Sequence, residues 1–487
     1  MSAAEPIRSI AICGAGLAGR MTAAALTRSL PPSIEITLVD CCAADADMFY
    51  GSVTPPTAYE FNLNAGVTEP RLVLDTNTAF SWGTTYQRWG GANRSWVQCY
   101  HLALPILEGV LFHHYLAQQG LWDLQQYLIP ALAARRGAFA HPPEKGPHPL
   151  ARAEYGYQFT PSAYAALFAA AADPARLKTI TAPIARVDAD DRGVSAIHFA
   201  DGSAVRADLF IDCTGPGPAL LSHVGSRFAG ARRLRAAESF APADRIGAPC
   251  RTIAAESFGW RSDTPLREAI ARLTICDPES EADALSQHGE APARAAEATL
   301  GRFAEAWRGN CVAIGQAAGV VEPISSAPML LLQRDIERLL SLIPISTDMS
   351  IERREFNRHF AADYDLAGLF NRALFETNGL PETPYWRAAR EEPLDQRLAR
   401  KIEQFESRGI LVAYDLEPFN LEDWTILHCG MGRRPARYDP LADKAEKDRV
   451  RLYLETMRSD IEKAAASMPD HHTYLARLTQ FLSTQQG

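Results

Sequence analysis

Three glycines at fixed spacing are the first residues in the chain whose types predict chemistry. Gly14, Gly16 and Gly19 form the pattern GxGxxG directly after the apolar run SIAIC. In this pattern the first glycine permits a tight turn, the second lets backbone N–H groups approach a pyrophosphate, and the third lets a helix pack close to a strand. Asp40 follows a second apolar run and can accept hydrogen bonds from a ribose diol. The spacing therefore predicts a bound dinucleotide; the alternative is a glycine-rich turn that binds none.

The elements that position these residues are expected to form a βαβ unit. The run 9–13 reads as a buried strand, RMTAAALTRSL as a helix that ends before Pro31, and 34–39 as a second strand. Further along, GVSAIHFADGSAVRADLFIDCTG predicts strands around an Asp-Gly turn, and CVAIG predicts a strand that leads through a glycine-bounded turn into a leucine-rich helix. The pattern predicts an α/β fold with a doubly wound nucleotide-binding domain, a second sheet-containing substrate region and a helical C-terminal part.

Long mixed segments separate these pieces, so the nucleotide-binding domain is expected to be discontinuous. Its predicted parts are residues 1–95, 160–225 and 300–345. The substrate-covering region, with the helical C-terminal part, is predicted over residues 96–159, 226–299 and 346–487.

Composition excludes several classes of protein. The 487 residues carry a formal net charge of -9 without a dense Lys/Arg run, so neither a nucleic acid nor an anionic membrane is expected as partner. No apolar run reaches the ~18 residues of a membrane span. The N-terminus lacks a signal-peptide pattern, and the nine cysteines never form CxxC, so we expect a cytoplasmic protein with reduced thiols and no metal. The pairs His113–His114 and His471–His472 lack partners at metal-ligand spacing and are expected on helix or loop surfaces.

Several segments, in the same order along the chain, resemble the flavin-dependent tryptophan halogenase family. They are GAGLAGRMTAAAL, GSVTPPTAYEFN, FSWGTTYQRW, NCVAIGQAAGVVEP, FNRHFAADYD, TPYWR and MPDHHTYL. The resemblance implies FAD as cofactor, delivered as FADH2 by a separate flavin reductase. No second GxGxxG is present for a nicotinamide, which agrees with delivery in trans. By the resemblance, the residues expected to bind FAD are Gly14, Gly16, Leu17, Ala18, Gly19, Asp40, Gly51, Val53, Thr54, Gly315 and Ile324.

The resemblance breaks at the residues that carry halogen chemistry in the family. There, reduced flavin and O2 form a hydroperoxide, halide attacks it, and a lysine and a glutamate deliver the halogen to an indole. Ser81 stands where the lysine belongs, and Ser325 where the glutamate belongs. The two backbone amides that hold the halide align with Ala327 and Pro328, and proline has no N–H. Of the family's WxWxIP, the segment Trp260–Pro265 keeps only the first tryptophan and the proline.

Three residues are candidates for the catalytic role. Ser81 and Ser325 are either hydroxyls that contact substrate or space-filling replacements. His101 falls near a family position that lines the substrate pocket, where a neutral imidazole can act as a base; the alternative is a structural histidine.

The resulting expectation is an FAD-dependent two-component monooxygenase or oxidase on the halogenase scaffold. It would use FADH2 and O2 on an electron-rich aromatic or tryptophan-derived substrate, free or peptide-borne, without halogenation. The alternatives are a true halogenase with relocated catalytic residues and a flavin-binding protein without catalysis. The resemblance also implies a homodimer.

Overall fold

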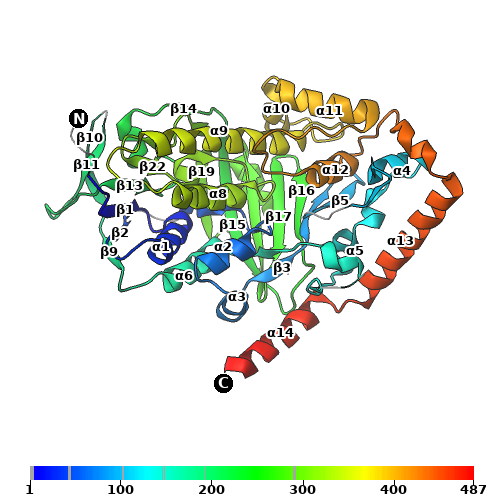
Figure 1. Cartoon of the computed structure of the whole chain (residues 1–487), viewed down its shortest axis with the longest axis horizontal. Coiled ribbons are helices and arrows are strands. Elements are labelled where there is room, and N and C mark those ends of the chain that lie inside the picture. Colours follow the sequence, from blue (N-terminus) through cyan, green and yellow to red (C-terminus); the bar gives the residue numbers. More distant parts are fainter. Residues whose placement is uncertain are drawn as a thin grey trace.

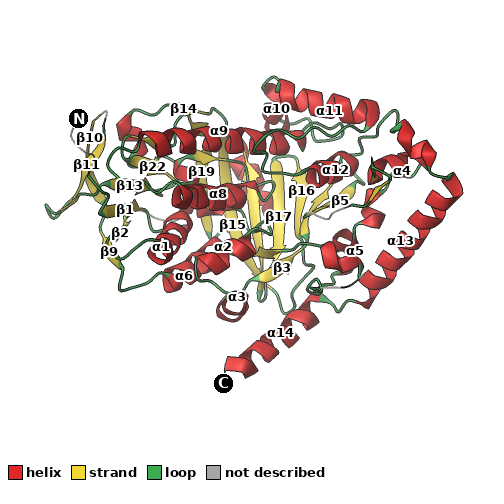
Figure 2. Cartoon of the chain, viewed as in Figure 1, coloured by secondary structure: helices red, strands yellow, loops and turns green. Residues whose placement is uncertain are grey.

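Two large β-sheets organise the chain, and helices cover them (Figures 1 and 2). The computed structural model describes residues 5–41, 45–100, 104–144, 146, 148–190, 192–288 and 292–486. In Figure 1 the first sheet lies at the left, beside the N-terminus, and the second fills the centre. The fold is mixed α/β with a helical C-terminal part, as the sequence predicts.

The first sheet has six strands in the order β21-β22-β13-β1-β2-β9. Strands β1, β2, β9, β13 and β22 run parallel, and β21 is antiparallel to β22. Their near-continuous apolar sequences are typical of strands buried on both faces. The bounds are β1 Ser9–Cys13, β2 Glu35–Asp40, β9 Leu177–Thr181, β13 Leu209–Asp212, β21 Trp307–Arg308 and β22 Cys311–Ala313; the helices α1 Leu17–Ser29, α6 Pro161–Ala171 and α8 Ala327–Ser341 lie nearby.

The second sheet has seven strands in the order β19-β15-β18-β17-β16-β4-β5. Except for the parallel pair β16 and β4, neighbouring strands are antiparallel. The bounds are β4 Gly83–Gln87, β5 Ser95–Cys99, β15 Arg233–Pro242, β16 Arg251–Glu256, β17 Gly259–Pro265, β18 Ala269–Cys276 and β19 Arg294–Thr299.

Smaller sheets accompany the two large ones. The predicted Asp-Gly turn is present: Gly202 N–H donates to the Phe199 carbonyl (3.1 Å) between β11 and β12. The small sheets comprise β3 Ala79–Ser81 with β8 Gly156–Gln158, β6 Ile106–Leu107 with β7 Val110–Leu111, β10 Ile184–Asp190 with β11 Gly193–Phe199 and β12 Ala204–Val205, and β14 Phe228–Ala229 with β20 Gly301–Phe303 and β23 Gly319–Val320.

Helices make up the chain after β23. The long α9 lies along α8, and α13 and α14 form the right and lower edge of the molecule in Figure 1. The C-terminal helices are α9 Ser350–Ala373, α10 Pro384–Glu391, α11 Gln396–Arg408, α12 Leu421–Gly430, α13 Lys447–Ser467 and α14 His471–Gln486; the remaining ones are α2 Ala58–Asn64, α3 Glu69–Asp75, α4 Phe112–Gln118, α5 Ile129–Arg136 and α7 Glu281–His288. Among the described residues, no helix has the length and apolar character needed to span a bilayer.

The turn between β1 and α1 requires two of its three glycines for reasons of space. Gly14 has φ +100°, and a Cβ there would lie 2.4 Å from the Cys213 carbonyl oxygen at the end of β13. A Cβ on Gly19 would lie 1.7 Å from the Gly14 carbonyl oxygen. The first turn of α1 therefore packs directly on the chain that leaves β1, which is the close approach that the pattern predicts.

Replacing Gly19 with Ala is expected to destabilise the protein, because the new Cβ meets backbone that cannot move aside without disturbing the sheet. Overpacking of this kind costs about 1–3 kcal/mol or more. The control is Gly368→Ala in α9, where a Cβ meets nothing within 4 Å. Urea unfolding followed by circular dichroism should show a clear loss for Gly19→Ala and no loss for the control. Equal midpoints would contradict this explanation of Gly19.

Candidate functional site

The expected flavin-binding residues come together where two turns and a short extended segment meet. The first turn joins β1 to α1 and contains Gly14, Gly16 and Gly19. The second follows β22 and contains Gly315. The extended segment is 51–54. Its Thr54 amide donates to the Tyr157 carbonyl in β8 (2.9 Å), and Thr54 Oγ1 accepts from the Tyr157 amide (2.9 Å).

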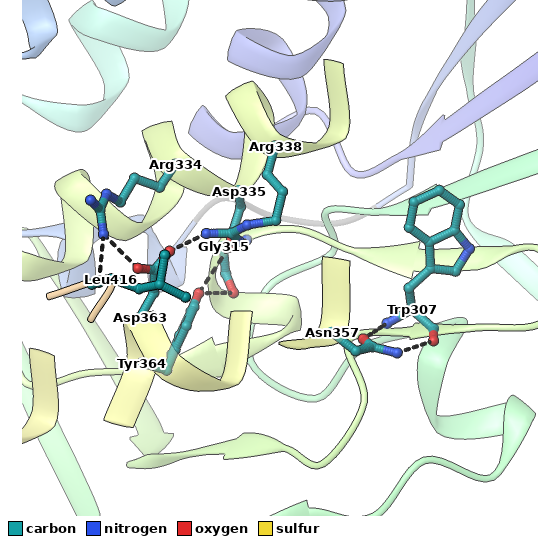
Figure 3. A network of polar contacts seen from close by, with 9 residues as sticks. All are labelled: Trp307, Gly315, Arg334, Asp335, Arg338, Asn357, Asp363, Tyr364 and Leu416. Carbon is teal, nitrogen blue, oxygen red and sulfur yellow. Dashed lines mark hydrogen bonds and ion pairs between the residues drawn. The ribbon is translucent and has the colours of Figure 1, made fainter. Parts of the chain in front are cut away.

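The second turn is fixed from behind by a buried ionic network, which Figure 3 shows. Asp335 in α8 accepts hydrogen bonds from the Gly315 amide (3.1 Å) and from the Tyr364 hydroxyl (3.0 Å), and Arg338 contacts its other oxygen (3.1 Å). Burial raises the pKa of Asp335 to about 7. Asp363 in α9 joins the network through Arg334 and Arg338, so α8 and α9 together hold the turn in one conformation.

Ser81 and Ser325 are buried, and both hydroxyls are engaged within the chain. Ser81 Oγ donates to the Gly83 carbonyl and accepts from the Gly83 amide, both at 3.2 Å. Ser325 Oγ donates to Asn371 Oδ1 (2.6 Å) and accepts from the Ala327 amide (3.1 Å). Each serine thus accepts from an amide two residues later in the chain, and Ser325 is also bonded to α9; a catalytic role of either residue stays a prediction.

The start of α8 offers little to an anion. The Ala327 amide is already used by Ser325, and Pro328, within the first turn, has no N–H. Of the two expected halide donors, the Ala327 amide is therefore already occupied, and Pro328 provides none. His101 lies outside the described residues, so its catalytic role stays a prediction.

A cation that the sequence analysis did not single out lies at the centre of the site. Arg251, the first residue of β16, is fully buried and donates to the carbonyl oxygens of Pro323 (2.9 Å) and Ile324 (3.1 Å). Its Nε has no hydrogen-bond partner, and no carboxylate pairs with it among the residues described. Burial lowers its pKa. Gly51 lies against it, since a Cβ there would be 3.3 Å from Arg251 Nη1.

A polar cluster around the Glu69 carboxylate, beside Phe80, could not be predicted from the sequence, because its members come from distant parts of the chain. Glu69 accepts from the hydroxyls of Tyr155 (2.8 Å) and Tyr157 (2.7 Å) and contacts His141 Nε2 (3.0 Å). Burial alone would raise the pKa of the Glu69 carboxyl. The hydrogen bond and the charge of His141, together with the hydrogen bonds from Tyr157 and Tyr155, outweigh burial and lower this pKa. Glu69 is therefore a carboxylate acceptor held in place by three partners.

The prediction that the two histidine pairs lie on the surface is wrong for three of the four residues. His113, His114 and His471 are buried, at 5%, 6% and 1% exposure. His471 accepts from the Phe80 amide at Nε2 (3.2 Å), and its Nδ1 donates to the Gly247 carbonyl (3.0 Å). The local sequence is compatible with either a buried or an exposed histidine, and the packing of α14 in the tertiary structure decides for burial. His471 fixes the backbone next to Ser81.

FAD, the cofactor that the sequence implies, does not fit the site as these residues are arranged. The Asp47 carboxylate lies where the glycine turn would receive a pyrophosphate, because its Oδ2 accepts from the Leu17 amide (2.9 Å). Beside the second turn, the free space lined by Tyr50, Gly315 and Tyr364 amounts to about 10 Å³. A site for a molecule of drug size typically encloses some 300–1,000 Å³. Three larger cavities, of about 350, 500 and 390 Å³, are lined by other residues.

The fold and the glycine turn define a protein of the mixed α/β class with a largely parallel first sheet, and the comparisons give the family. The family model described as tryptophan halogenase matches residues 9–447. The chain belongs to the tryptophan halogenase family, whose members are flavin-dependent enzymes.

Relatives and solved structures match over nearly the whole chain. Tryptophan 7-halogenase KtzQ from Kutzneria sp. is 24% identical and aligns with 97% of this chain and 99% of its own. The flavin-dependent halogenase BrvH from Brevundimonas sp. is 28% identical, with a TM-score of 0.89 over 97% of this chain and 99% of that one. Xcc4156, a flavin-dependent halogenase from Xanthomonas campestris, has a TM-score of 0.88 at 24% identity, over 97% and 98% of the two chains.

The buried His471 predicts an acid-sensitive stability. Burial lowers its pKa to about 4, whereas an unfolded histidine titrates near 6.5. Between these values the unfolded chain takes up a proton that the folded protein does not, so stability is lost as the pH falls from about 6.5 to about 4. The shift corresponds to about 3 kcal/mol.

Urea unfolding at pH 7 and pH 5 measures this loss. His471→Asn should weaken the protein at pH 7, because the contacts of Phe80 and Gly247 change, and should reduce the further loss at pH 5. His223→Asn, at an exposed position, is the control and should behave as wild type. An undiminished acid loss in His471→Asn would contradict the assignment.

Proposed function

We propose that the protein is an FAD-dependent oxidoreductase of the tryptophan halogenase superfamily that oxidises an electron-rich aromatic substrate without transferring halogen. FADH2, supplied by a separate flavin reductase, and O2 would be the co-reactants. The substrate is either a free aromatic compound or an aromatic residue in a peptide. Membership of the family supports flavin dependence, and the contacts of the two serines support the absence of halogenation.

The start of α8 supports the proposal that no halogen is transferred. At the start of α8, Ser325 takes the Ala327 amide and Pro328 lacks one, so neither of the two expected donors is free to bind a halide. Binding an anion in a site closed to water needs preorganised donors, because loss of hydration costs several kcal/mol. Ser81 supplies no cationic nitrogen, and its hydroxyl is already bonded at both its donor and its acceptor side.

The chain's own groups would orient a substrate and hold its protons. Glu69, fixed by two tyrosine hydroxyls and His141, is a carboxylate that can accept a proton, and His141 links it to the Tyr474 hydroxyl (2.5 Å). Such a chain of bonds can pass a proton between its members. It lies directly behind Phe80, next to Ser81.

The test is product analysis by mass spectrometry. The purified protein is incubated with a flavin reductase, NADH, FAD, O2, chloride or bromide and a panel of indoles and tryptophan-containing peptides. We expect no halogenated product and, on an accepted substrate, a mass increase of one oxygen atom or a loss of two hydrogen atoms. A product with the isotope pattern of chlorine or bromine would refute the proposal.

Arg251 favours a second candidate function, a halogenase with relocated catalytic groups. It is a fully buried guanidinium beside Ile324, with no carboxylate partner among the described residues, and an uncompensated buried charge is strongly unfavourable unless an anion joins it. In that case Arg251 would be the cation that the lysine position lacks. The test measures bromination and FAD affinity in the wild type and in Arg251→Met. If the wild type brominates and the variant does not, while both bind FAD equally, a halogenase is favoured over an oxidising enzyme.

A further inference from the structure

One short segment contacts both glycine turns of the expected flavin site. It is the 3₁₀ helix Asp45–Tyr50, which follows β2 and leads into the extended segment 51–54. Asp47 reaches the first turn, and Tyr50 reaches the second. The segment therefore joins the two halves of the site in the position where a dinucleotide would have to run.

Asp47 binds the N-terminus of α1 as an anion would. Its Oδ2 accepts from the Leu17 amide (2.9 Å), and a Cβ on Gly16 would lie 3.0 and 3.1 Å from its two oxygens. The helix itself supplies no cap there, because Gly16 has no side chain and the first turn of α1 carries no acidic residue. The partial positive charge of a helix N-terminus attracts a carboxylate for the same reason that it attracts a phosphate. Both cannot occupy the same amide.

Tyr50 closes the second turn. Its hydroxyl accepts from the Gln316 amide (3.1 Å), and a Cβ on Gly315 would lie 2.4 Å from that oxygen. The side chain is buried, at 3% exposure, and burial, followed by the charge of Asp47, raises its pKa well above the usual value. Phe49 and Tyr364 help to fill the space, and about 10 Å³ remain, roughly the room for one water molecule.

We propose that the segment Asp45–Tyr50 is a built-in plug that competes with FAD for both glycine turns and must be displaced before the cofactor binds. The inference rests on the proposed function, because it concerns how that function's cofactor gains access. The apparent FAD affinity is then the intrinsic affinity multiplied by the fraction of molecules in which the plug is open. Removing the negative charge of Asp47 weakens the closed state and also removes a carboxylate that repels the pyrophosphate.

The direct experiment is a titration of FAD, followed by quenching of its fluorescence, with wild type and with Asp47→Asn. The variant keeps the shape of the side chain and loses its charge, so we expect it to bind FAD about tenfold more tightly or better. Asp190→Asn is the control: it makes the same change in net charge at an exposed site on β10 and should leave the affinity unchanged. Equal or weaker FAD binding by Asp47→Asn overturns the plug.

A second measurement uses the wild type alone, so it does not depend on the folding of a variant. Hydrogen–deuterium exchange of the peptide that covers 45–54 should rise when FAD binds, while β1 and β13 stay protected. Tight FAD binding with unchanged exchange of this peptide overturns the plug and leaves the proposed function standing. If neither wild type nor Asp47→Asn binds FAD, the proposed function fails together with the plug.

Discussion

The hydrogen bond from the Leu17 amide to the Asp47 carboxylate decides what the rest of the site can accept. The turn between β1 and α1 is built for an anion: Gly14 and Gly19 bring the helix against the strand, and the helix N-terminus points outward with its amides. A carboxylate of the same chain satisfies this preference as well as a phosphate does. The electrostatics of the family's cofactor turn are thus retained, while its ligand position is filled from within.

Polar groups at the centre of the molecule also hydrogen-bond mainly to one another. Arg251 donates to the carbonyls of Pro323 and Ile324, and Ser325 takes the Ala327 amide. Buried polar groups must find partners, and here most of them find each other. Arg251 Nε is one of the exceptions, and among the described residues no carboxylate pairs with this buried guanidinium. The fold is similar to that of flavin-dependent halogenases, and in this chain the polar groups around Ile324 are bonded largely to one another.

The parts that sequence predicted are those that local pattern determines. The βαβ unit follows from apolar runs, a glycine turn and a following helix, and the hairpin at Asp201-Gly202 follows from its turn residues. The family could also be inferred, because several motifs occur in the right order, and the family match confirms it.

The parts that sequence missed depend on contacts through space. Nothing in DADMFY indicates that Asp47 will cap a helix thirty residues earlier in the chain. Arginine is mostly exposed in proteins and histidine is buried only in some positions, so the burial of Arg251 and His471 follows from the packing of β16 and α14. The Glu69 cluster draws on α3, β8 and the segment after α5, which the sequence gives no reason to place together.

A crystal structure of the protein soaked with FAD shows whether the cofactor and Asp47 compete for the Leu17 amide. We expect density for the pyrophosphate at the Leu17 amide, with Asp47 moved away from it and Tyr50 withdrawn from Gln316. FAD bound in the glycine turn, with the contact between Asp47 and Leu17 intact, would contradict this expectation.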